Sequence, residues 1–286
     1  MGIIFGFLSM LGWGISDFLA AKSSRKIGSV LTFFWSQIFS FLIGLIYFFL
    51  KFQIFYKKDI FNFFPPLLLI GFLYTIATLF FYEGLIKGKV SLVSPIGASY
   101  SWIIVLLSAI FFKEILKTNQ IIGIISIIFG VPLLSINLRE LSEIKKLNTF
   151  NGAKEGLIAM LGWGFALFLI TPASRALGWF LPIFALRLFT LLFVAGYIIF
   201  SNQSFKINFQ PPLFVLLSLI GLLDMGASFT YCFGVSKEYA SIVAPIAASF
   251  PLVTILLAKI FLKEKLLPNQ ILGIISVIAG LILISI

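Results

Sequence analysis

The sequence contains no histidine and a single cysteine, Cys232. Histidine is the commonest metal ligand and the usual proton shuttle near neutral pH, and without it no imidazole can activate a serine. One cysteine excludes a disulfide framework within the chain. The hydrolase motif G-x-S-x-G, the zinc motif H-E-x-x-H and the ATP-binding P-loop are also absent. We therefore expect a protein that is not an enzyme and that needs no metal or cofactor.

Charged residues are scarce as well, at 11% of the chain, whereas hydrophobic residues make up 60%. This balance is far from that of a soluble domain. Apolar segments of about twenty residues, enough to cross roughly 30 Å of hydrocarbon as a helix, follow one another along the chain. We predict ten membrane spans, at about 3–21, 30–50, 64–86, 90–112, 118–136, 155–172, 180–200, 211–235, 239–261 and 268–286. The expected fold is an all-α polytopic membrane protein, because isolated strands would leave backbone groups unpaired in lipid.

The stretch MLGWG occurs at 10–14 and again at 160–164. The same shift of 150 residues aligns Arg25 with Arg175, Gly28 with Gly178, Gly71 with Gly221, Gly84 with Gly234, Pro95 with Pro245, and Lys113-Glu114 with Lys263-Glu264. It also aligns NQIIGIISIIFG at 119–130 with NQILGIISVIAG at 269–280. A register kept through most of the chain indicates an internal duplication. We divide the chain into a first repeat at 1–136, a connecting loop at 137–154 and a second repeat at 155–286.

Each repeat holds five of the ten predicted spans, an odd number. The second copy must therefore enter the membrane from the side opposite to the first, which makes a five-plus-five inverted repeat. Transporters built in this way bind substrate near the middle of the membrane, where the two halves meet. We predict a central site between two halves that rock against each other. A duplication that serves only packing is the alternative.

Two features of the repeats resemble the EamA family of the drug/metabolite transporter superfamily. These are the GWG of the first and sixth spans, and the run from a proline into Lys-Glu, Pro95 to Glu114 and Pro245 to Glu264. The resemblance covers nearly the whole chain. It implies a secondary transporter of small metabolites, often an exporter, whose cavity is lined by spans one, three and four and by spans six, eight and nine. It also implies cytoplasmic termini, whereas the distribution of Lys and Arg among the loops favours termini on the outside.

Four ionisable residues are candidates for a position inside the membrane, namely Asp17, Glu83, Arg187 and Asp224. A charge inside the membrane is costly, so each of them needs a reason. Asp224 shares one helical stripe with Ser228 and Tyr231, and this stripe should line the cavity. Asp224 would then bind a cationic group of the substrate or carry a coupling proton, or it would pair with Arg187. Arg187 could instead hold a carboxylate or phosphate.

The other two acids are Asp17 and Glu83. Asp17 follows Trp13 by four residues and shares its helical face, so it is a candidate for the cavity mouth, with an interfacial position near Lys22 as the alternative. For Glu83 an ion pair with Lys87, one turn later at the helix end, is favoured over a role in the site. None of the four charges is repeated after 150 residues. Unequal charges on a symmetric frame suit an asymmetric ligand such as an amino acid.

Aromatic residues make up 17% of the chain, so most rings must simply pack. Trp13 and Trp163 are the best candidates for substrate contact, because they occupy equivalent positions between glycines that allow close backbone approach. Further candidates for aromatic walls are Tyr82, Tyr100, Trp102 and Tyr231.

Pro95 and Pro245 lie near the starts of the fourth and ninth spans, where a proline removes one backbone hydrogen bond and permits a bend. They mark either flexible points around the site or ordinary tolerance of proline in membrane helices. Ser99 and Ser249, four residues after each proline, offer hydroxyls to a substrate. The glycines of spans five and ten, Gly123, Gly130, Gly273 and Gly280, favour close helix packing, within the chain or in a homodimer.

The expected function is secondary transport of a small polar or amphipathic metabolite by alternating access, by export or exchange, with amino-acid-like substrates favoured. A flippase for lipids or lipid carriers is the alternative. The net charge of +11 is spread over short loops, which favours contact with lipid headgroups over nucleic acid. We expect a multi-pass protein of the cell membrane.

Overall fold

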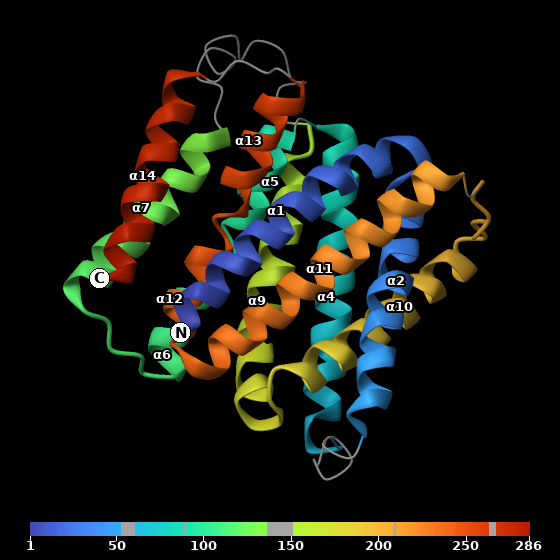
Figure 1. Ribbon diagram of the computed structural model, residues 1–286, viewed down its shortest axis with the longest axis horizontal. Helices are drawn as coiled ribbons and strands as arrows, with labels where there is room; N and C mark the ends of the chain where they lie inside the picture. Colours follow the sequence, from blue (N-terminus) through green and yellow to red (C-terminus); the bar gives the residue numbers. More distant parts are fainter. Residues whose placement is uncertain (53–60, 89, 136–150, 209, 263–266) are drawn as a thin grey trace.

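The computed structural model describes residues 1–52, 61–88, 90–135, 151–208, 210–262 and 267–286. The connecting loop predicted at 137–154 therefore lies mostly outside the described residues. The long helices are α1 (Gly2–Ile27), α2 (Ser29–Leu50), α4 (Phe64–Lys87), α9 (Ala153–Leu177), α10 (Phe180–Phe200) and α11 (Pro211–Lys237). The shorter helices are η1 (Phe61–Phe63), α5 (Val90–Ala98), α6 (Ser101–Phe111), α7 (Thr118–Ser135), α12 (Ala240–Ala247), α13 (Phe250–Leu262) and α14 (Pro268–Ser285). Both termini lie at the same end of the molecule (Figure 1).

Within the described ranges, nine helical segments are long and apolar enough to cross a membrane. Two of these segments combine shorter helices, Leu92–Phe111 from α5 and α6, and Ala240–Phe261 from α12 and α13. The remaining predicted span is the shorter apolar helix Thr118–Leu134. The predicted all-α polytopic membrane fold is confirmed.

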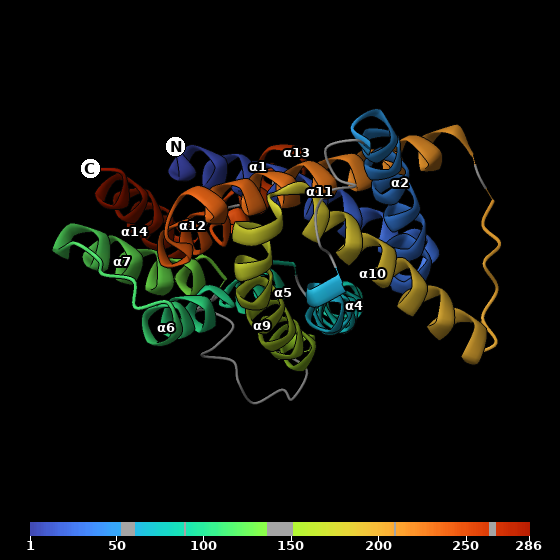
Figure 2. The ribbon, with the colours of Figure 1, turned by 90° about the horizontal axis from the view of Figure 1, so that it is seen from below.

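The two repeats pack so that equivalent helices make equivalent contacts. Helix α1 packs against α11, and α9, its copy, packs against α4, which is the copy of α11. Helix α7 packs along its own copy, α14, at one flank of the molecule (Figures 1 and 2). There Ser276 Oγ donates a hydrogen bond of 2.8 Å to the carbonyl oxygen of Ser126, the residue at the equivalent position. Contacts between equivalent positions place a pseudo-two-fold axis between the repeats.

The glycines of α7 and α14 are used at this contact. A Cβ atom on Gly123 would lie 2.7 Å from the carbonyl oxygen of Gly280, and one on Gly280 would lie 2.6 Å from that of Gly123. Gly130 and Gly273 make the matching contact. A Cβ atom on Gly273 would lie 2.9 Å from the carbonyl oxygen of Gly130. Only a residue without Cβ lets the two backbones approach this closely. Of the two expectations for these glycines, packing within the chain is the one found, so they offer no surface to a homodimer.

The turns after the first helix of each repeat explain a second pair of repeated glycines. Gly28 alone separates α1 from α2 and has a φ of 85°, and Gly178 ends α9 with a φ of 86°. L-residues avoid this left-handed region because their Cβ meets the backbone. The repeated glycine therefore allows each helix pair to reverse direction within one or two residues.

The fourth and ninth spans differ from the prediction of one helix each. Each is two helices, α5 then α6 and α12 then α13, and the breaks come four to five residues after Pro95 and three to four residues after Pro245. At the breaks the backbone tightens, with Tyr100 N–H donating to the Gly97 carbonyl at 3.2 Å. The hydroxyls of Ser99 and Ser249 donate to the carbonyls of Pro95 and Pro245, at 2.8 Å and 3.0 Å. Such side-chain bonds to the preceding turn help to bend a helix.

A buried carboxylate joins the two repeats at the end of the molecule that carries the termini. Glu114, between α6 and α7, accepts hydrogen bonds of 3.0 Å from the backbone N–H groups of Ala240 and Ser241 at the start of α12. It also pairs with Arg175 near the end of α9 at 2.9 Å. Arg175 in turn donates to the Val235 carbonyl near the end of α11. A negative charge at a helix N-terminus is favourable, so Glu114 holds three helix ends of the second repeat together.

Candidate functional site

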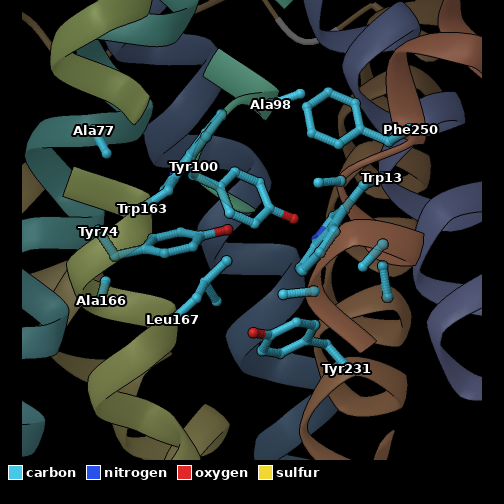
Figure 3. Packing of buried hydrophobic residues seen from close by; sticks show 14 of the residues in the cluster. Trp13, Tyr74, Ala77, Ala98, Tyr100, Trp163, Ala166, Leu167, Tyr231 and Phe250 are labelled. Carbon is cyan, nitrogen blue, oxygen red and sulfur yellow. The ribbon is translucent and has the colours of Figure 1, made fainter. Parts of the chain in front are cut away.

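A pocket with an empty volume of about 420 Å³, partly open to the surroundings, lies between the two repeats. It is lined by Trp13, Asp17, Tyr74, Thr78, Tyr82, Tyr100, Trp163, Leu167, Asp224 and Phe250. These residues come from α1, α4, α9, α11, α13 and the break between α5 and α6. The elements are those of spans one, three, four, six, eight and nine. Figure 3 shows Tyr74, Tyr100 and Trp163 facing Trp13 and Tyr231 across the middle of the protein.

Helical spacing brings several of these side chains to the pocket. Tyr74, Thr78 and Tyr82 follow one another at intervals of four residues on α4, and therefore share one face of that helix. The same interval separates Trp13 from Asp17 on α1, and their copies Trp163 and Leu167 on α9. Tyr100 and Phe250 reach the pocket at the helix breaks. In an unbroken helix these two side chains would lie further along a regular helix face.

Eight of the ten lining residues form four pairs related by the repeat. The pairs are Trp13 with Trp163, Asp17 with Leu167, Tyr74 with Asp224, and Tyr100 with Phe250. A pocket lined in this way surrounds the pseudo-two-fold axis. Its shape is therefore close to symmetric, whereas its charge is not, because both carboxyl groups lack a charged counterpart in the other repeat.

Arg187 and Asp224 form an ion pair deep in the protein. Arg187 Nη1 lies 2.8 Å from Asp224 Oδ2, and the arginine is 0% exposed. The guanidinium also donates to Gln37 Oε1 at 3.1 Å and contacts the hydroxyl of Ser228. Its carbon lies 5.3 Å from the centre of the Tyr74 ring. Because Gln37 is the repeat copy of Arg187, and Tyr74 that of Asp224, this cluster also sits on the axis.

The carboxylate of Asp224 has its hydrogen-bonding capacity filled. Oδ1 accepts hydrogen bonds from Trp13 Nε1 at 3.2 Å and from the Tyr74 hydroxyl at 3.4 Å. Oδ2 accepts from Gln37 Nε2 at 3.3 Å, in addition to its contact with Arg187. A carboxylate offers about four lone-pair positions, and four donors occupy them here. The sequence left two roles open for Asp224, a role in the site and an ion pair with Arg187. The geometry matches the ion pair.

Asp17 differs from Asp224 in its surroundings. Its side chain lines the same pocket and is partly buried. Among the residues that the structure describes, none donates a hydrogen bond to Asp17 or forms an ion pair with it. The pocket therefore contains one carboxyl group that is held by a counterion and one that is not.

The two tryptophans are fixed by their ring nitrogens. Trp163 Nε1 donates to the hydroxyl of Thr78 at 3.1 Å, whereas Trp13 Nε1 donates to Asp224, whose copy in the first repeat is Tyr74 and not Thr78. Tyr231 packs on Trp13, with ring centres 5.6 Å apart, and is fully buried behind it. These contacts orient both indole rings toward the pocket, and they place Tyr231 outside its lining.

The residues proposed from sequence fall into two groups. Those that line the pocket are Trp13, Asp17, Tyr82, Tyr100, Trp163 and Asp224. Those that are not part of the lining are Ser99, Trp102, Arg187, Ser228, Tyr231 and Ser249. The serines at the helix breaks bond to proline carbonyls, and Ser228 bonds to Arg187 and to the carbonyl of Asp224. Glu83 lies outside the lining and forms the predicted helix-end pair with Lys87 at 3.5 Å.

Sequence reasoning named Tyr100 as a candidate for an aromatic wall but did not single out the lining residues Tyr74, Thr78, Leu167 and Phe250. The repeat provides a signal for two of them, because the 150-residue shift carries Asp17 to Leu167 and Asp224 to Tyr74. Tyr100 and Phe250 are copies of each other, and Pro95 and Pro245 indicate a bend nearby, but the sequence does not show that each span breaks into two helices there.

The comparisons with known proteins agree with this architecture. The model of the EamA-like transporter family matches residues 1–136 and 152–286, which is one match for each repeat. An uncharacterized protein of Methanocaldococcus jannaschii is 46% identical over 65 residues, which are 23% of this chain and 47% of that relative. The match thus spans about half of the relative's length. A solved structure titled only as the crystal structure of a protein has a TM-score of 0.76 at 13% identity, covering 99% of this chain and 95% of that one. That likeness concerns the fold alone.

The family match covers both repeats and more than half of the chain, and nine helical segments of the described residues are long and apolar enough to cross a membrane. The protein belongs to the EamA-like transporter family.

Proposed function

We propose that the protein is a secondary transporter that exports or exchanges a small polar or amphipathic metabolite across the cell membrane by alternating access. The observation that supports this most directly is the pocket on the pseudo-two-fold axis, lined by four pairs of equivalent residues. In an inverted repeat each half can adopt the conformation that the other half had. This exchange opens the same site first to one side of the membrane and then to the other.

The helix breaks support the same proposal. Tyr100 and Phe250 reach the pocket from positions at or next to the breaks that follow Pro95 and Pro245. Discontinuous helices near the middle of the membrane are a recurring feature of substrate sites in transporters with inverted repeats. A bend at each break would move one pocket wall without separating the long helices.

The charges of the pocket bear on the preference for amino-acid-like substrates. A zwitterion needs a positive group for its carboxylate, but none of the ten lining residues is Lys or Arg. Arg187 is already engaged by Asp224. The lining therefore offers more to the amine group of a substrate than to its carboxylate.

The outer faces of the helices support contact with membrane lipid. Large apolar side chains are exposed there, among them Ile46, Phe49 and Leu50 on α2, and Ile199 and Phe200 on α10. Apolar surface of this extent is stable only against hydrocarbon or a protein partner. We propose that lipid surrounds these helices in the cell membrane.

The test compares two Leu→Trp variants on α9. Leu167 lines the pocket and is 4% exposed, so Leu167→Trp should fill it, whereas Leu161 is 50% exposed and Leu161→Trp should only add an outward-facing ring. Purified protein is reconstituted in liposomes, and counterflow of radiolabelled amines, amino acids, sugars, nucleosides and phosphorylated metabolites is measured. We expect one chemical class to be transported by the parent protein and by Leu161→Trp, but not by Leu167→Trp.

Thermal unfolding with the same compounds provides a second measurement, because a ligand at 100 times its Kd stabilises the folded state by about 2.7 kcal/mol. Equal transport by the two variants would contradict a substrate site in this pocket. Movement of fluorescent lipid between leaflets, with no transport of any soluble compound, would favour a flippase instead.

A further inference from the structure

The charge balance of the pocket leaves one negative charge without a partner. Asp17 and Asp224 are the only acidic residues among the ten that line it, and no basic residue is among them. Asp224 is compensated by Arg187 at 2.8 Å and saturated by neutral donors. Asp17 has neither kind of partner within the described part of the chain. A ligand that occupies this pocket therefore meets one carboxyl group, that of Asp17, for which no described residue provides a counterion.

The walls of the pocket are mostly aromatic. Six of the ten lining residues are Trp, Tyr or Phe, namely Trp13, Tyr74, Tyr82, Tyr100, Trp163 and Phe250. The face of an aromatic ring attracts a cation within about 6 Å, and this attraction grows when water is excluded. Rings from the two repeats face each other across the pocket (Figure 3). A carboxylate beside several ring faces is the arrangement by which proteins recognise organic ammonium groups.

One buried hydroxyl group also favours a ligand with an ammonium group. Tyr100 is 1% exposed, and its hydroxyl has no hydrogen-bond partner among the residues described. Figure 3 shows this hydroxyl directed toward Trp13, into the space between the repeats. A buried polar group left unpaired is costly, so a ligand that donates a hydrogen bond to it would be favoured. An ammonium group donates such bonds and accepts none.

We propose that the transported substrate is a monovalent organic amine, held in its protonated form by Asp17 as counterion, by the aromatic walls and by the Tyr100 hydroxyl. This inference rests on the proposed transport function and specifies its substrate class. A bare metal ion fits less well, because such ions require several oxygen ligands and six of the lining residues are aromatic.

The test uses four probes that share a phenyl ring and differ in charge: phenethylamine, phenylalanine, 3-phenylpropionate and 2-phenylethanol. Binding is followed by quenching of tryptophan fluorescence, and transport by counterflow in liposomes. We expect phenethylamine to bind most tightly. Asp17→Asn keeps the shape of the side chain and removes its charge, and should weaken phenethylamine binding by about tenfold or more. The same change should leave 2-phenylethanol binding unaltered.

Two further variants serve as controls. Asp17→Glu restores the charge and should recover most of the amine binding. Glu83→Gln removes a carboxylate that lies outside the pocket and should bind phenethylamine like the parent protein. Unchanged amine affinity in Asp17→Asn, or tighter binding of the zwitterion or the anion, would overturn the inference. So would failure of all four probes to bind. In those cases the proposed function would still stand if the protein transported another compound and Leu167→Trp blocked that transport.

Discussion

Replacing Asp224 by asparagine would leave Arg187 charged, buried and without its counterion. Asparagine matches aspartate in shape and can still accept hydrogen bonds at one oxygen from Trp13 and Tyr74. Its amide nitrogen, however, would face the donors of Arg187 and Gln37 in place of the oxygen that now accepts from them. The variant therefore removes one charge and sets donors against each other at the centre of the protein.

The size of the effect follows from the burial of the pair. Removing one partner of a buried ion pair costs about 3–5 kcal/mol, because the remaining charge is left uncompensated. For a domain of this size each kcal/mol shifts the melting temperature by roughly 2–4 °C, so Asp224→Asn should melt about 6–20 °C lower. Arg187→Gln should cost a similar amount, since it leaves the Asp224 carboxylate buried.

The chain carries its own reporter for this measurement. Cys232 is the single cysteine and is fully buried. A maleimide dye that fluoresces on reaction with a thiol will therefore report unfolding in detergent as Cys232 becomes accessible. The melting temperatures of all variants can be compared in this way without an added label site.

Two comparisons make the result decisive. In the double variant Arg187→Gln with Asp224→Asn no charge is left unpaired, so its loss should be smaller than the sum of the single losses by at least about 1 kcal/mol. Glu83→Gln, which breaks an exposed helix-end pair, should leave the melting temperature nearly unchanged. An unchanged melting temperature in Asp224→Asn would refute the assignment of a stabilising buried pair. A loss of stability in the double variant equal to the sum of the two single losses would refute this assignment as well.

Two other predictions concern the joints between helices, and the same unfolding assay checks both. Glu114→Gln should lower stability by about 1.5–3 kcal/mol, because the charge that pairs with Arg175 and caps α12 is lost; an unchanged melting temperature would show that the contact contributes nothing. Gly28→Ala and Gly178→Ala should each cost about 1–3 kcal/mol, because a positive φ with an extended ψ strains any residue that has a Cβ. Gly196→Ala, inside α10 with open space around it, should instead be neutral or stabilising, and equal effects at all three glycines would exclude strain as the cause.

Much of the architecture follows from the sequence because it depends on local properties. The length of each apolar segment decides whether it can cross a membrane, and the 150-residue shift reveals the duplication whatever the helices later contact. The repeated glycines and prolines likewise predict turns and bends. Trp13 and Trp163 could be proposed for the pocket for the same reason, since the repeat marks them as equivalent.

The roles of the charged residues depend on contacts between distant helices. Asp224 and Asp17 both follow from sequence as acids within spans, and neither position shows which of them has a counterion. Arg187 reaches Asp224 only because α10 and α11 pack beside each other, with Gln37 of α2 completing the cluster. No helix of the described structure brings a partner to Asp17. Whether a buried charge is neutralised depends on distances of a few ångströms between segments that are far apart in the chain.

The sequence by itself thus determined the membrane-spanning helices, the inverted repeat and the aromatic and acidic residues from which a site could be built. The tertiary structure decided that the glycines of α7 and α14 join the repeats, that the fourth and ninth spans break, and that Asp17, unlike Asp224, has no partner among the described residues. The physical reason is that hydropathy and periodicity act along the chain. Charge compensation and cavity lining instead arise between helices, where close packing determines which groups meet.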